Sequence, residues 1–151
     1  MPRHVCGMLF AALACLVTVA SAEAQSNRPA FVTLQPEDVE WKQPLGLGVA
    51  ITTLHGDPAK PGLFIQRVRF PPGVFDRPHF HNGDRHVTVI KGTWYVGMGK
   101  DWEPAKATAM KPGSYMFQPA HAVHWDGAKD EDAVLLIMGE GPATSTAAEE
   151  K

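Results

Sequence analysis

The sequence predicts an all-β protein, folded as a sandwich or a small barrel. Three observations favour this class. Short runs of apolar and β-branched residues recur along the chain, proline and glycine separate them at short intervals, and no segment beyond the N-terminus has a long helical periodicity. About eight or nine short strands with turns between them are typical of an antiparallel sandwich or barrel.

The N-terminal segment 1–24 is predicted to be a signal peptide. Arg3 supplies a positive start, residues 5–20 form an uncharged apolar run, and small residues precede a cleavage point near Ala24. A membrane anchor is the alternative, but the run is shorter than the about 20 residues that a spanning helix needs. Both cysteines of the chain lie in this segment, so the mature chain has no disulfide. We therefore expect a periplasmic or secreted protein with no stable membrane anchor after cleavage.

The mature chain is predicted to contain a lead-in, a barrel and a tail. Residues 25–45 are the lead-in, expected to pack on the barrel and to form one helical turn where acidic residues follow Pro36. The barrel is predicted over 46–141, and the small, polar residues 142–151 are predicted to be a disordered tail. The charged residues 126–132 are expected to form a turn. The expected strands are 46–54, 63–70, 86–91, 93–98, 105–110, 115–118 and 133–138.

Length and charge limit the function classes. The 151 residues suit one domain, and the net charge of −2 is nearly balanced. There is no block of basic residues, which argues against a nucleic-acid partner. The sequence also has no Ser-His-Asp arrangement and no carboxylate pair placed for catalysis, so it offers no catalytic machinery apart from its histidines.

The histidines form the most informative cluster. His79 and His81 are separated by one residue, so in a strand their side chains point to the same face. Such a pair alone is more often structural than metal-binding, but His124 begins a second candidate segment further on. Three imidazoles brought together from two strands would form a site for a divalent ion. His55 and His121 are more simply explained as exposed residues.

Two segments together resemble the two sequence motifs of the cupins, which are small β-barrel proteins. The first resembling segment contains Gly73, His79, His81, Arg85 and Gly92, and the second contains Gly113, Pro119, His121 and His124. The resemblance implies a single jelly-roll (cupin) barrel of two antiparallel sheets with one divalent metal ion near its mouth. It assigns His79, His81 and His124 as metal ligands, and leaves open whether the ion is Mn, Fe, Ni, Zn or Cu.

Three positions depart from the cupin motifs. Arg85 stands where the family has a glutamate ligand, His121 where it usually has glycine, and Ala128 where it usually has asparagine. Arg85 supports three interpretations. In the first, three imidazoles suffice as metal ligands and Arg85 binds an anionic substrate. In the second, His86 becomes a fourth nitrogen ligand. In the third, the metal site is lost and the barrel only binds a ligand.

The function classes follow from these interpretations. The first is a metal-dependent dioxygenase, isomerase or lyase acting on a small anionic or enolisable molecule. The alternative is a non-catalytic periplasmic module that binds a small molecule or a metal. A purely structural domain would require the histidine spacing to be a coincidence. A homodimer formed through sheet edges is a further expectation, since exposed edges need protection.

Overall fold

A computed structural model of the protein describes residues 31–42 and 48–148. The predicted signal peptide, residues 25–30 and 43–45 of the lead-in and the last three residues of the predicted tail lie outside these residues. The chain divides into two units after Thr33, and the barrel belongs wholly to the second. Within the described part of the chain, no helix is long and apolar enough to cross a lipid bilayer.

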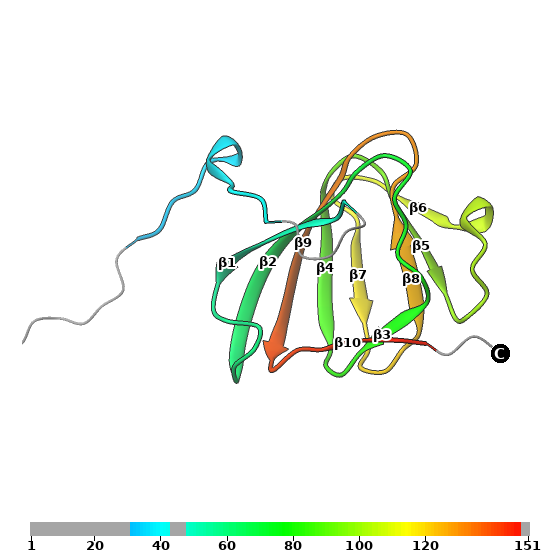
Figure 1. Ribbon diagram of the computed structural model, residues 1–151. Coiled ribbons are helices and arrows are strands. Elements are labelled where there is room, and N and C mark those ends of the chain that lie inside the picture. Colours follow the sequence, from blue (N-terminus) through cyan, green and yellow to red (C-terminus); the bar gives the residue numbers. More distant parts are fainter. Residues whose placement is uncertain (1–30, 43–47, 149–151) are drawn as a thin grey trace, which may run out of the picture. The chain divides into compact units, whose positions relative to one another are not determined.

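The described residues form ten strands in two antiparallel five-stranded sheets (Figure 1). The first sheet has the order β1-β2-β9-β4-β7 and the second the order β10-β3-β8-β5-β6. The strands are β1 (Ala50–His55), β2 (Gly62–Phe70), β3 (His79–His81), β4 (Arg85–Lys91), β5 (Trp94–Met98), β6 (Thr108–Met110), β7 (Tyr115–Gln118), β8 (His124–Gly127), β9 (Ala133–Gly141) and β10 (Ser145–Ala147). Two single turns of 3₁₀ helix accompany them, η1 (Pro36–Asp38) and η2 (Pro104–Lys106). This architecture confirms the predicted all-β jelly roll of two antiparallel sheets.

The core lies between the inner faces of the two sheets. On β4, Val87 and Val89 are buried while the residues between and beyond them are partly or fully exposed. This alternation places one apolar side chain inward at every second residue. From the opposite sheet, Trp94 and Val96 of β5 pack into the same cluster. The two inner faces therefore interdigitate as in other β-sandwiches.

Four of the expected strands match the structure to within one residue. These are 63–70, 86–91, 93–98 and 115–118, which correspond to β2, β4, β5 and β7. The strand expected over 105–110 is shorter, because Pro104 starts a 3₁₀ turn and only Thr108–Met110 pairs with β5. The strand expected over 133–138 continues to Gly141, because β2 pairs with it along its whole length.

Two expectations about the second half of the chain are wrong. The charged turn expected over 126–132 begins too early, because His124–Gly127 forms β8 in the middle of the second sheet. The tail expected to be disordered from 142 contains β10, which pairs with β3 through Ser145↔His81 and Ala147↔His79. Composition missed this strand because its three side chains are all exposed and its pairing comes from backbone groups.

Candidate metal centre

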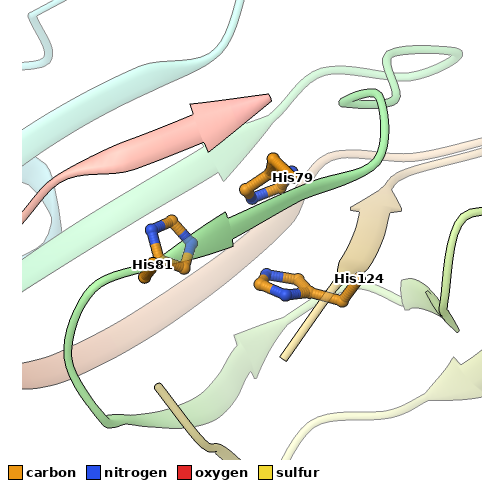
Figure 2. A group of neighbouring side chains, drawn as sticks. All are labelled: His79, His81 and His124. Carbon is orange, nitrogen blue, oxygen red and sulfur yellow. The ribbon is translucent and has the colours of Figure 1, made fainter. Parts of the chain in front are cut away.

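The two histidine motifs meet on adjacent strands of the second sheet. His79 on β3 is directly paired with His124 on β8, and His81 lies on the same face one pleat along β3. The ring centroids are 4.5 Å apart for His79 and His124, 5.0 Å for His79 and His81, and 5.2 Å for His81 and His124. Figure 2 shows the three rings turned toward one common space. One nitrogen from each ring lies within 4.8 Å of the others, so the group could hold one metal ion.

Backbone carbonyls hold each of the three rings in one orientation. The acceptors at Nδ1 are the carbonyl oxygens of Arg77 for His79 at 2.8 Å, Thr144 for His81 at 3.1 Å and Ala122 for His124 at 3.0 Å. A carbonyl oxygen only accepts, so each Nδ1 carries the proton and each Nε2 keeps its lone pair. Metal-binding histidines are commonly oriented in this way, and the donor set fits a divalent ion.

Burial keeps two of these imidazoles neutral. It lowers the pKa of His81 to about 3, with the nearby Arg85 guanidinium adding to the effect. It also lowers the pKa of His124 to about 4, against a smaller opposing effect of the hydrogen bond to Ala122. Because a metal ligand must be an unprotonated imidazole, both side chains are ready to bind a metal ion at neutral pH without losing a proton.

The histidines border a cavity of about 320 Å³ between the sheets. One part of its wall is apolar and comes mainly from the core strands: Phe64, Val68, Phe70, Val87, Trp94 and Ile137. The residues that follow β9 also line it, including Thr144 and Ser145. The cavity thus combines an apolar wall with a small polar region around the imidazoles, as small-molecule sites commonly do.

Arg85 reaches this cavity from the opposite sheet. It begins β4, and its Nη1 contacts Nε2 of His81, while its Nε is buried without a hydrogen-bond partner. The adjacent Asp84 does not pair with it but accepts the backbone N–H of Ala120 at 2.8 Å. The ion pairs found among the described residues, Asp57–Lys60 and Glu103–Lys106, do not include Arg85. Its guanidinium is therefore placed to bind an anion inside the cavity.

Two carboxylates also lie at the site, and neither belongs to the residues that the sequence predicts for it. Asp76 and Asp126 form a second group with His79, with one ligand atom from each residue within 4.8 Å of the others. Asp126 accepts a hydrogen bond from Nε1 of Trp94 at 2.9 Å. Burial raises the pKa of Asp76 to about 6, helped by repulsion from Asp126. Asp126 could have been found from its parity, because it follows His124 by two residues and faces the same side of β8.

His86 is not part of this cluster. It is exposed on β4, where side chains alternate, so it faces away from the side occupied by Arg85. Its Nδ1 lies 2.7 Å from the hydroxyl of Tyr115, and its ring centroid is 5.5 Å from that of Phe117. The interpretation that His86 supplies a fourth nitrogen ligand is therefore wrong.

His121 lies outside the cluster as well. It is exposed in the loop before β8 and has a φ of 62°. Glycine adopts this left-handed conformation without steric cost, which fits the glycine that the resembling motif usually has at this position.

An antiparallel jelly roll with a histidine cluster at its inner cavity is the arrangement that the resemblance to the cupins implies. The profile of the ChrR cupin-like domain matches residues 29–144, and the chain belongs to this family. No curated protein sequence matches the chain.

Solved structures similar to the chain include proteins described as enzymes and proteins described only as cupins or cupin-like. The polyketide cyclase RemF from Streptomyces resistomycificus has a TM-score of 0.67 and 14% identity, over 81% of this chain and 88% of RemF. The DMSP lyase DddQ from Ruegeria pomeroyi has a TM-score of 0.60 and 19% identity, over 74% of this chain and 63% of DddQ. A cupin-like protein from Thermotoga maritima has a TM-score of 0.55 and 24% identity, over 68% of this chain and 79% of that protein. At these identities the likeness shows the fold alone.

Proposed function

We propose that this cupin binds one divalent metal ion through His79, His81 and His124 and acts as an enzyme on a small anionic or enolisable molecule. One observation carries the proposal. Three imidazoles from two strands converge at a cavity, and each has its Nδ1 held by a backbone carbonyl so that its Nε2 is the metal-binding atom. A structural role alone would not require three rings to be oriented in this way.

The bound ion would act as a Lewis acid on a carbonyl or enol oxygen of the substrate. Arg85 supplies the complementary binding group, because its planar fork of donors matches a carboxylate. The apolar wall formed by side chains such as Phe64 and Trp94 accommodates the rest of the molecule and excludes water from it. A cavity of about 320 Å³ restricts the substrate to a small compound.

Among the enzyme classes, a lyase or an isomerase is favoured over a dioxygenase. Two proteins of similar fold are described as a polyketide cyclase and a DMSP lyase. A metal ion held by imidazoles also suits these reactions, since stabilising an enolate requires charge but no change of oxidation state.

The first experiment measures the metal content of the mature protein, purified without a chelating tag, by elemental analysis. About one equivalent of a divalent metal is expected from a three-ligand site. The triple variant His79→Ala/His81→Ala/His124→Ala should contain none, with His55→Ala as the matched histidine control. Failure of the wild type to take up Mn, Fe, Co, Ni, Cu or Zn would reject the proposal.

A second candidate is a non-catalytic module of the periplasm that binds a small acid or a metal. The observation that favours it is Arg85, which stands where the cupin motif has a carboxylate ligand. Export follows from the proposed signal peptide and would be tested by cell fractionation. Stoichiometric metal and carboxylate binding without turnover of any enolisable substrate would support this candidate over the enzyme.

A further inference from the structure

Both ring nitrogens of His81 are engaged by other parts of the chain. Nδ1 lies 3.1 Å from the carbonyl oxygen of Thr144, and Nε2 is in contact with Nη1 of Arg85. A carbonyl can only accept and a guanidinium can only donate. The proton therefore sits on Nδ1, and the lone pair of Nε2 accepts a hydrogen bond from Arg85.

This lone pair is the one that a metal ion would need. An imidazole nitrogen has a single lone pair, so Nε2 can bind an Arg85 N–H or a metal ion but not both. The other two rings differ in this respect. No hydrogen bond within the described part of the chain engages Nε2 of His79 or of His124. Competition between the chain and a metal ion thus falls on His81 alone.

Charge reinforces the competition. A guanidinium beside a divalent cation in a cavity of low polarity is repelled more strongly than it would be in water. Arg85 also lacks a carboxylate partner among the ion pairs of the described residues, although Asp76 and Asp126 border the same cavity. An anion that pairs with the guanidinium would satisfy its donors and weaken its bond to His81.

We propose that Arg85 and a divalent ion compete for Nε2 of His81, and that a ligand carrying a carboxylate removes Arg85 from the competition and so tightens metal binding. The proposal rests on the proposed metal site and adds that metal and carboxylate bind cooperatively. Cooperativity of this kind is reciprocal, so the metal ion also tightens binding of the carboxylate. Arg85 is then a specificity-determining residue: the site gains its full ligand set only when an anionic molecule is present.

The first test compares the Zn²⁺ affinity of the wild type and of Arg85→Gln by competition with a chelating dye. Removing a charged hydrogen-bond donor from a ligand atom should raise the affinity at least about tenfold. Lys91→Gln is the matched control, since it removes a positive charge from an exposed position on the same strand. In the His81→Ala background the effect of Arg85→Gln should become smaller, because only the charge repulsion between Arg85 and the metal ion then remains. Equal affinities of the wild type and Arg85→Gln would overturn the inference and leave the metal site intact.

The second test uses the wild type, so it does not depend on how a variant folds. Zn²⁺ affinity is measured with propionate and with propionamide, which has nearly the same shape but no charge. Propionate should tighten Zn²⁺ binding to the wild type and not to Arg85→Gln. An equal gain in both proteins would mean that propionate binds the metal directly, and would overturn the role of Arg85. No Zn²⁺ binding by any of these proteins under either condition would reject the proposed function and this inference with it.

Discussion

His79 on β3 and His124 on β8 are directly paired across the two strands, and their ring centroids lie 4.5 Å apart. In the sequence, the four strands β4, β5, β6 and β7 lie between these two residues. The antiparallel pairing of β3 and β8 therefore creates the site, and each motif alone supplies an incomplete set of ligands. This relationship makes the contribution of each histidine measurable by single substitutions.

His124→Ala is expected to lower metal affinity by more than about 100-fold. Loss of a group that only orients a ligand costs about 10- to 100-fold, and loss of the ligand itself costs more. His86→Ala should leave metal affinity unchanged, because His86 is exposed and interacts with Tyr115 and Phe117. Isothermal titration with Zn²⁺ measures both variants. Comparable losses in the two would mean that His86 reaches the metal.

Asp76→Asn is expected to change how stability depends on pH in protein stripped of metal by a chelator. Burial, with repulsion from Asp126, raises the pKa of Asp76 from 3.8 to about 6. A raised pKa adds stability at low pH, where the carboxyl is protonated, and this stability is lost as the pH rises through about 6. Between pH 4 and pH 8 the variant should gain about 2 to 3 kcal/mol relative to the wild type.

Urea unfolding at several pH values tests the prediction for Asp76. Asparagine has nearly the same shape and no titrating proton, so the difference between the two proteins isolates this carboxyl group. Asp130→Asn, in an exposed turn, is the matched control. A constant difference between Asp76→Asn and the wild type over this pH range would show that Asp76 is not the titrating group.

The sequence predicted the parts of the fold that depend on strand periodicity. The core strands β2, β4 and β5 follow from alternating apolar residues, and the same alternation put His79 and His81 on one face. His124 came from the spacing of the second motif. These predictions are reliable because hydrophobic burial selects the inward face, and that choice is visible in the order of residues along one strand.

The sequence did not predict features that depend on partners distant in the chain. Asp126 is charged and next to Gly127, so local chemistry favours a turn, but Trp94 donates a hydrogen bond to it inside the barrel. The tail residues of β10 have no apolar pattern, and only pairing with β3 orders them. The contact between Arg85 and His81 likewise requires the two sheets to face each other.

Trp94→Phe is expected to destabilise the protein by about 1 to 3 kcal/mol. Trp94 is fully buried, and its Nε1 donates a hydrogen bond at 2.9 Å to Oδ2 of Asp126. Phenylalanine has no N–H, so Asp126 loses this donor in the variant. Trp125→Phe is the control, since Nε1 of Trp125 donates to the neutral carbonyl oxygen of Asp101. It should cost less, because Asp101 is exposed, so water can replace the lost donor, whereas Asp126 is buried. Chemical denaturation measures both; equal losses would assign the effect to packing.

Asn82→Ala is expected to loosen β10 and to weaken the metal site without unfolding the barrel. The Asn82 amide donates to the carbonyl of Pro142 at 2.8 Å, and its oxygen accepts the N–H of Thr144 at 2.7 Å. These bonds position the Thr144 carbonyl, which accepts from Nδ1 of His81 at 3.1 Å. Since the side chains of β10 are exposed, little burial would replace the lost bonds.

Three measurements follow for Asn82→Ala. The unfolding free energy should fall by only about 1 to 2 kcal/mol, amide hydrogen exchange should accelerate in 145–147, and Zn²⁺ affinity should fall about tenfold or more. Thr93→Ala is the control, because it removes an exposed hydrogen bond to Glu131, and neither residue belongs to β3 or β10. Faster exchange with unchanged affinity would show that the Thr144 carbonyl does not orient His81. Unchanged exchange would show that pairing with β3 alone holds the strand, and Asn82 would then have no part in the site.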